Sequence, residues 1–145
     1  WPGLMSTLFK KQVLIDNPLD ERFRSGEDIE IRWRLKTNGY KMGVSQSVFV
    51  KHWFGDTYEF AKDQWVQDGK GLGRMVAKYG LKTLHLVGIP AAGALRGIGL
   101  SLTRMQPGWI LYFLGYFWFN YTSIAAGLYE RLSKPELWIP SVVNR

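Results

Sequence analysis

Two adjacent carboxylates, Glu27 and Asp28, are the residues of this sequence with the plainest chemical use. The residues that follow them have helical spacing, so we expect the pair in the first turn of a helix. The free N–H groups and the dipole of a helix start favour negative charge, which keeps a carboxylate ionised. One ionised carboxylate can then accept a proton from a sugar hydroxyl while the other hydrogen-bonds the same sugar. A plainer role is also open, in which the pair only caps the helix and Asp28 pairs with Arg32 at i, i+4.

The helix that would carry this pair is well marked at both ends. Ser25 is a candidate N-cap, with Asp28 three residues on, close to a capping-box arrangement. Asn38-Gly39 supplies the left-handed residue that commonly ends a helix. The sequence therefore predicts a helix over residues 26–38.

Further elements flank this helix. Apolar spacing predicts a short helix within residues 4–14, ended by Asn17-Pro18 because the residue before proline disfavours the helical region. Residues 40–44 and 48–50 alternate or run apolar like short strands, and the pattern is helical again from Thr57 to Tyr79. This mixture predicts an α/β segment.

Several short motifs surround the acidic pair in a fixed order: Leu19-Asp20-Glu21-Arg22-Phe23, Gly26-Glu27-Asp28, Arg34-Leu35, Gly39-Tyr40, and a strand ending in His52. In this order and spacing they resemble the acceptor-side signature of family-2 glycosyltransferases, over roughly residues 5–80. The resemblance implies a GT-A fold and inverting transfer of a sugar from a nucleotide-sugar to a hydroxyl acceptor. It further implies that Asp28 is the catalytic base, with Glu27 binding the acceptor.

That family holds its nucleotide-sugar and a divalent metal, Mg²⁺ or Mn²⁺, with an Asp-x-Asp motif in its N-terminal half. No Asp-x-Asp occurs in these 145 residues, which open on Trp1-Pro2-Gly3. We interpret the chain as a fragment, inactive alone, of a longer protein that carries the main metal ligands elsewhere. His52 follows the strand-like run at a position where some relatives supply a third metal ligand, and a neutral imidazole suits a divalent ion. Otherwise it is a strand-end histidine that meets solvent.

Basic residues give a second set of candidates. Lys70, Arg74 and Lys78 recur every fourth residue and so form one stripe on the predicted helix. The stripe could bind a diphosphate or a lipid head group, or it could be a solvated face. With Arg34 from the acceptor-side motifs, Lys70 and Arg74 are our candidate acceptor- or phosphate-binding residues. Gln64-Trp65 and Asp68-Gly69 resemble a gate-like segment that follows the catalytic helix in processive relatives. The Gln-x-x-Arg-Trp motif of those relatives is absent, so processive synthesis is not expected.

Composition narrows the partners. A net charge of +7 with 15% aromatic residues suits nucleic acid, an anionic membrane or phosphorylated substrates. Nucleic acid is not expected, because many aromatics lie in an apolar tail instead of between basic residues. The absence of cysteine excludes a disulfide framework, a thiolate nucleophile and Cys-ligated zinc.

The tail is far less charged than the rest: of 31 charged residues, 23 lie in positions 1–80. Residues 83–103 and 108–129 are apolar segments near the roughly 20 residues that cross a bilayer. Lys82 before them and Arg131 after them favour a hairpin with both ends cytoplasmic. Arg96 would be costly inside a bilayer, and lying in the interface avoids that cost. Both arrangements stay open.

We therefore predict an acceptor-side, GT-A transferase part at residues 1–80 and an apolar, membrane-associating helical tail at residues 81–145. The expected setting is the cytoplasmic face of the cytoplasmic membrane, where a glycan or lipid-linked acceptor of cell-envelope polysaccharide synthesis would be extended. The alternative is a non-catalytic membrane-anchoring or interaction module.

Overall fold

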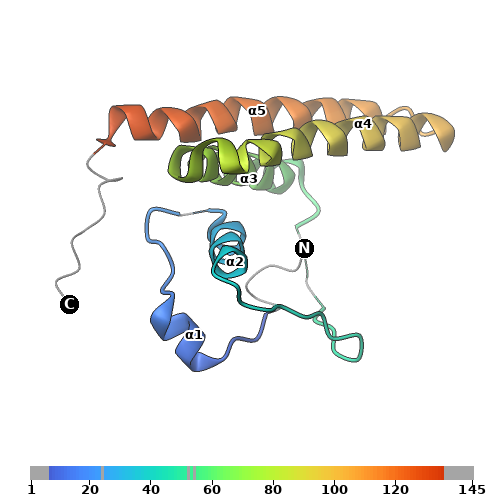
Figure 1. The fold of residues 1–145 in the computed structure, drawn as a ribbon. Helices are drawn as coiled ribbons and strands as arrows, with labels where there is room; N and C mark the ends of the chain where they lie inside the picture. Colours follow the sequence, from blue (N-terminus) through green and yellow to red (C-terminus); the bar gives the residue numbers. More distant parts are fainter. Residues whose placement is uncertain (1–6, 24, 52, 54, 136–145) are drawn as a thin grey trace.

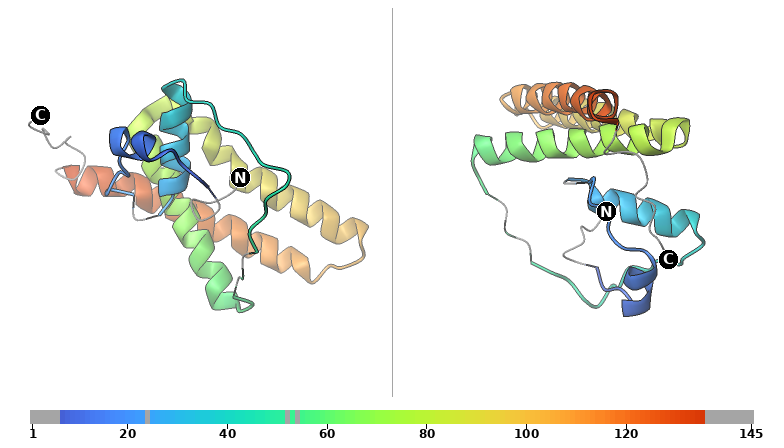
Figure 2. Two further views of the ribbon diagram at one scale, coloured as in Figure 1. Left: turned by 90° about the horizontal axis from the view of Figure 1, so that it is seen from below. Right: turned by 90° about the vertical axis from the view of Figure 1, so that its left-hand side faces the viewer.

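The fold is a stack of helices, seen in a computed structural model that describes residues 7–23, 25–51, 53 and 55–135. Helices α4 (Gly88–Thr103) and α5 (Trp109–Ser133) form an antiparallel hairpin at the top of Figure 1. Helix α3 (Tyr58–Tyr79) packs against this hairpin and crosses α5 obliquely (Figure 2). Helices α2 (Glu27–Thr37) and α1 (Lys11–Asp16) lie on the opposite side of α3.

The α/β prediction is wrong, because the described residues contain helices and no strand. Residues 40–44 and 48–50 follow an extended path, and their large side chains face solvent, with Val44 82% and Phe49 91% exposed. A strand needs a neighbouring strand to pair its N–H and C=O groups. Alternating side chains alone do not provide that neighbour, and the described part of the chain offers none.

The helices flanking this extended path were predicted well. The helix expected over residues 26–38 is α2, and the helix expected from Thr57 is α3. The Thr57 hydroxyl accepts a hydrogen bond from the Phe60 N–H at 3.2 Å, so it caps α3. Helix α1 starts later than expected and ends before Asn17-Pro18, as the proline rule predicts.

Glycines set how closely α3 and α5 approach. A Cβ atom on Gly69 would lie 2.4 Å from the Asn120 carbonyl oxygen, and one on Gly73 would lie 2.4 Å from that of Ile124. Gly127 of α5 meets the Lys70 backbone in the same way. Backbone therefore packs directly on backbone along this contact, which only glycine permits.

The chain turns sharply between α3 and α4. Gly80 has a φ of 63°, which favours glycine, and begins the 3-10 helix η2 (Gly80–Val87). The buried Thr83 hydroxyl donates to the carbonyl oxygens of Met75 and Gly80, both at 3.1 Å. The first predicted apolar segment is thus shared between η2 and α4, and the second lies within α5, so both are confirmed as helical.

One stretch of the described chain, Tyr58–Thr103, contains a window long and apolar enough to cross a membrane by length and composition. The stretch is α3, η2 and α4 taken together, and it changes direction at the turn after Tyr79. Only α4 and the preceding η2 supply its apolar part.

Candidate acidic site at the start of helix α2

The start of α2 is fixed against α3 by two glycines. Gly26 occupies the N-cap position with a φ of 76°, in the left-handed region. A Cβ atom on Gly26 would lie 2.8 Å from the Gly71 Cα, and one on Gly71 would lie 2.9 Å from the Gly26 Cα. Any side chain at either position would push the helices apart, so the two glycines determine where the next two residues stand.

Those next residues are Glu27 and Asp28, both half-buried in the first turn of α2. One carboxylate oxygen of Asp28 accepts the N–H of Ile29 at 2.8 Å. Among the interactions of the described residues, no ion pair holds Asp28 and no side-chain hydrogen bond or ion pair holds Glu27. The fold therefore places two carboxylates at the positive end of a helix dipole, and among the described residues only the Ile29 N–H binds either of them.

The capping explanation of this pair is met only in part, by the Ile29 N–H that Asp28 accepts. The N-cap is Gly26, which has no side chain, and the predicted N-cap Ser25 is instead buried. Its hydroxyl accepts a hydrogen bond from Arg74 Nη1 at 3.2 Å. The pairing of Asp28 with Arg32 is also not among the ion pairs of the described residues, and Nη2 of Arg32 is buried without a hydrogen-bond partner.

Asp68 of α3 is a third carboxylate beside this site, and the sequence analysis did not select it. It lies three residues before Gly71, on the side of α3 that meets the start of α2. Its enclosure by protein atoms and the negative charge of Asp28 raise the pKa of Asp68 above its ordinary value. The surface that Asp68 leaves open faces a cavity, so the side chain is at once enclosed and accessible to solvent.

That cavity has a volume of about 530 Å³ and lies where α3, α4 and α5 meet. Half of the described residues that line it are aromatic, and a few are polar: Gly55, Phe60, Ala61, Gln64, Trp65, Asp68, Gly93, Tyr112, Phe113 and Tyr116. The spacing of Phe60, Gln64 and Asp68 at i, i+4 and i+8 places them on one face of α3 and was readable from the sequence. The contributions from α4 and α5 were not, because they depend on how the hairpin folds back.

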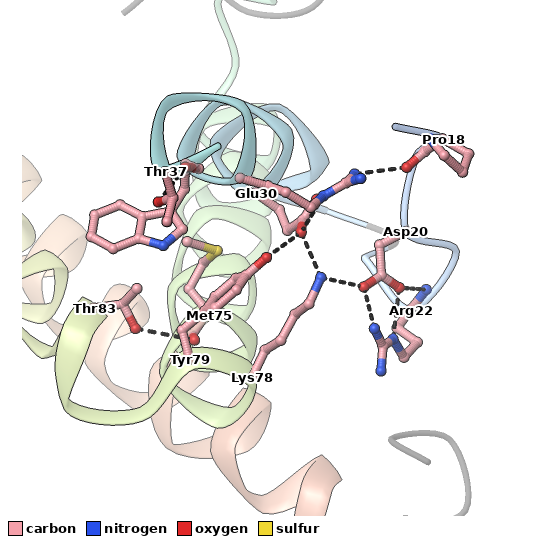
Figure 3. A network of polar contacts seen from close by, with 11 residues as sticks. Pro18, Asp20, Arg22, Glu30, Thr37, Met75, Lys78, Tyr79 and Thr83 are labelled. Atoms are coloured by element: carbon pink, nitrogen blue, oxygen red, sulfur yellow. Dashed lines mark hydrogen bonds and ion pairs between the residues drawn. The ribbon is translucent and has the colours of Figure 1, made fainter. Parts of the chain in front are cut away.

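A second acidic residue of α2, Glu30, has a structural role that Figure 3 shows. Its side chain is 1% exposed and accepts hydrogen bonds from Lys78 Nζ at 2.5 Å and from the Tyr79 hydroxyl at 2.5 Å. Lys78 also donates to Asp20 at 2.7 Å, and Arg22 binds that same carboxylate. Burial alone would raise the pKa values of Asp20 and Glu30, but these hydrogen bonds hold both below their ordinary values.

The basic candidates are largely engaged within the chain. Arg34 donates to Glu30 at 3.1 Å and to the Pro18 carbonyl oxygen at 2.7 Å. Arg74 is buried and donates to both carboxylate oxygens of Glu130, at 2.8 and 3.0 Å. Lys70 is half-buried. The stripe of Lys70, Arg74 and Lys78 therefore includes two residues whose charge is balanced by α2, α5 and the segment before α2.

The metal prediction lies mostly beyond what the structure describes. His52, the candidate ligand, falls outside the described residues. Among the described residues, no three His, Cys, Asp or Glu side chains gather so that they could hold a metal ion. His85 of η2 contacts the Trp33 ring at 5.6 Å between ring centres.

The chain matches no family model, no curated protein and no solved structure. Its function is therefore argued from the sequence motifs and from the geometry above.

Proposed function

We propose that this chain supplies the acceptor side and the catalytic base of an inverting, nucleotide-sugar-dependent glycosyltransferase at a membrane surface. One observation carries the proposal: Glu27 and Asp28 are held in place by the backbone contact of Gly26 with Gly71, yet no ion pair among the described residues neutralises their charges. The resemblance of the surrounding motifs to family-2 glycosyltransferases supplies the reaction. The proposal rests on the helical site and requires no sheet in this part of the chain.

The chemistry needs a base and an orienting group. In the proposed step, a carboxylate oxygen of Asp28 takes the proton of the acceptor hydroxyl. The acceptor oxygen then bonds to the anomeric carbon from the face opposite the diphosphate, and the bond from that carbon to the diphosphate oxygen breaks, with its electron pair leaving on the nucleotide. Glu27 accepts a hydrogen bond from a second hydroxyl of the acceptor and so orients it.

A divalent metal would normally neutralise the leaving diphosphate. The described residues do not bring together a ligand set for it, and the candidate His52 lies outside them. No step is therefore assigned to a metal on this chain.

Membrane association, the second part of the proposal, is supported by the outer face of α5. Its exposed residues recur every three or four positions and are mostly apolar: Leu111, Leu114, Trp118, Thr122, Ala125, Tyr129 and Leu132. No acidic residue occurs between Asp68 and Glu130, whereas Arg96 and Arg104 are exposed on this hairpin. An apolar face with only positive charges beside it suits an anionic lipid surface.

The same geometry favours a hairpin that lies in the interface over one that spans the bilayer. Helix α4 has 16 residues, or roughly 24 Å at 1.5 Å per residue, which is short of the roughly 30 Å hydrocarbon core. The inner face of α5 packs along α3, which carries charged residues such as Asp63, Asp68 and Lys70. A spanning hairpin would have to bring those charges into the hydrocarbon or lose that contact.

The test compares two carboxylate-to-amide changes in the complete gene product. Asp28→Asn removes the proton acceptor but keeps an oxygen that can accept the Ile29 N–H. General-base catalysis contributes about 10²–10⁴-fold, so the sugar-transfer rate should fall by that factor while the melting temperature stays near that of the wild type. Glu59→Gln is the control, because it is an exposed acid in the first turn of α3. It should leave the rate unchanged.

An Asp28→Asn protein that folds and keeps its full transfer rate would remove Asp28 as the base. If the wild-type gene product releases no sugar from any nucleotide-sugar, the non-catalytic anchoring module becomes the better account.

A further inference from the structure

The cavity between α3, α4 and α5 has the size of a small-molecule binding site. Its volume of about 530 Å³ is within the usual range of about 300–1,000 Å³ for small-molecule sites. It lies outside the motifs that suggest the transferase, apart from the gate-like region around Gln64-Trp65.

The aromatic part of the lining is held rigidly. Trp65 is 4% exposed, and its ring contacts Tyr112 edge-on at 4.8 Å, Tyr116 edge-on at 6.1 Å and Phe119 face-to-face at 6.3 Å between centres. Tyr112 is more open and makes a further edge contact with Phe113 at 5.3 Å. Fixed aromatic surfaces of this kind bind the flat C–H face of a ring without the entropy cost of ordering side chains.

The polar part of the lining consists of hydrogen-bonding groups without positive charge. Asp68 and Gln64 contribute a carboxyl and an amide, and two tyrosines contribute hydroxyls. The described residues that line the cavity include no Lys, Arg or His, and Asp28 adds negative charge beside Asp68. A phosphate or a carboxylate would be repelled there, whereas a neutral polyhydroxylated ring would find both apolar faces and hydrogen-bond partners.

We propose that this cavity binds a neutral saccharide, and that Asp68 is its principal hydrogen-bonding residue. Under the proposed function, on which this last clause rests, the saccharide is the terminal unit of the acceptor. Asp68 lines the cavity and lies three residues before Gly71, which contacts Gly26, so a sugar bound to Asp68 would lie near the acidic start of α2. The acceptor would then be recognised as a glycan through its sugar, and not through a phosphate.

The binding experiment needs no donor and no turnover. The chain is held in zwitterionic micelles without sugar head groups, and three neutral disaccharides (maltose, cellobiose and lactose) are titrated by calorimetry and by saturation-transfer NMR. Glucose 6-phosphate and decanol are the comparison probes. At least one disaccharide should bind, more tightly than glucose 6-phosphate and decanol. Binding of glucose 6-phosphate or decanol alone, or no binding of any disaccharide, would overturn the proposal.

Two glycines of α4 provide a matched pair of variants that locate the binding. A Cβ atom on Gly93 would lie 3.3 Å from the Tyr116 hydroxyl, inside the cavity, whereas one on Gly99 would have no atom within 4 Å. Gly93→Leu should therefore raise the dissociation constant at least tenfold, and Gly99→Leu should leave it unchanged. Helix content from circular dichroism checks that both fold. Equal affinities in these two folded variants would place the sugar elsewhere.

A second pair tests Asp68 in case the cavity-filling variant misfolds. Asp68→Ala should weaken disaccharide binding at least tenfold, while Asp63→Ala, an exposed acid on the same helix, should not. Unchanged binding in Asp68→Ala would contradict its assigned role. The binding experiment and the transferase test can fail independently. If disaccharides bind in the cavity but Asp28→Asn keeps full activity, the cavity proposal is supported and the proposed function is contradicted.

Discussion

The contact of α2 with α3 and the contact of α3 with α5 are stabilised by different kinds of interaction. Beyond the Gly26–Gly71 contact, the first is held by charges: Lys78 of α3 lies between Glu30 of α2 and Asp20 of the preceding segment. The second is held mainly by backbone packing, because Gly69 and Gly73 lie directly against carbonyl groups of α5, with the Arg74–Glu130 ion pair near its end. A contact made of charges depends on pH and salt, whereas a contact made of close backbone packing depends on shape. The acidic site itself is positioned by the Gly26–Gly71 backbone contact, while the charged contact around Lys78 holds the rest of α2 against α3. The glycines between α3 and α5 form the rigid contact.

The rigid contact should respond most strongly to a single methyl group. Gly73→Ala would place a Cβ atom 2.4 Å from the Ile124 carbonyl oxygen and 3.0 Å from the Gly127 Cα. Neither backbone atom can move aside easily, so we expect a loss of about 3 kcal/mol in the free energy of unfolding. Chemical denaturation in micelles measures it.

Gly99→Ala is the control for this change, since a Cβ atom there meets nothing within 4 Å. Alanine is the better helix former, so this variant should gain about 0.5–1 kcal/mol. Similar losses in both variants would show that the close approach of α3 and α5 is not what the glycines provide.

The charged contact should lose less when its central carboxylate is neutralised. Glu30→Gln removes the counter-charge of Arg34 and leaves Lys78 with Asp20 alone, and we expect a loss of about 2 kcal/mol in unfolding free energy. Asp63→Asn, an exposed acid bonded only weakly to Gln67 at 3.4 Å, should change it by less than about 0.5 kcal/mol. A loss in Glu30→Gln no larger than in Asp63→Asn would mean that charge does not hold α2 in place.

Lowering the pH should destabilise the charged contact of α2 with α3 before it affects the rigid contact of α3 with α5. The pKa values of Asp20 and Glu30 lie below their ordinary values of 3.8 and 4.5, so their stabilisation is complete above about pH 4.5 and is lost as the pH falls through the lowered values. Hydrogen-exchange protection factors of α2 amides should therefore fall between pH 5 and pH 2, while those in the middle of α5 persist. The Arg74–Glu130 ion pair at the end of α5 is the exception on that helix. Hydrogen bonds from Arg74 lower the pKa of Glu130, although burial acts to raise it, so acid should weaken this pair too. A simultaneous loss of protection in α2 and the middle of α5 would contradict the distinction.

The smallest expected effect is at Asp68. Its pKa is raised by its enclosure and by Asp28, so keeping it ionised at neutral pH opposes folding. For this group the stability is complete below the ordinary value of 3.8 and falls as the pH rises through the raised value. Because Asp68 is also solvent-exposed, Asp68→Asn should raise the melting temperature by no more than about 1 °C at pH 7 and leave it unchanged at pH 3. A decrease at pH 7 would show that the ionised carboxylate is held by a favourable contact instead.

The sequence predicted the helices well because their signals are local. Thr57 caps α3, Asn17-Pro18 ends α1, and the periodic apolar residues of α2 bury Ile31 and Leu35. The strands failed because a strand is completed by another strand, and nothing in residues 40–50 specifies one. Ser25 was predicted as a cap from its type, but Gly26 with its positive φ takes that position and leaves Ser25 to Arg74.

The candidate site was predicted in part for the same reason. Glu27 and Asp28 could be selected because they are adjacent and stand at a helix start. Asp68 and the cavity could not, because they depend on which face of α3 meets α2, α4 and α5. That choice is made by Gly69, Gly71 and Gly73, whose significance is visible only once their neighbours are known.

The most direct test of the account sets Asp28 against Glu30, two carboxylates on the same helix and two residues apart. Unfolding free energy and sugar-transfer rate are measured for Asp28→Asn and Glu30→Gln in the complete gene product. The account predicts that Asp28→Asn loses about 10²–10⁴ in rate with a stability change below about 0.5 kcal/mol. It predicts that Glu30→Gln loses about 2 kcal/mol of stability and, at a temperature where it stays folded, keeps its rate within about tenfold. The reverse pattern, or losses of rate that follow losses of stability in both variants, would contradict the division between a chemical and a structural carboxylate.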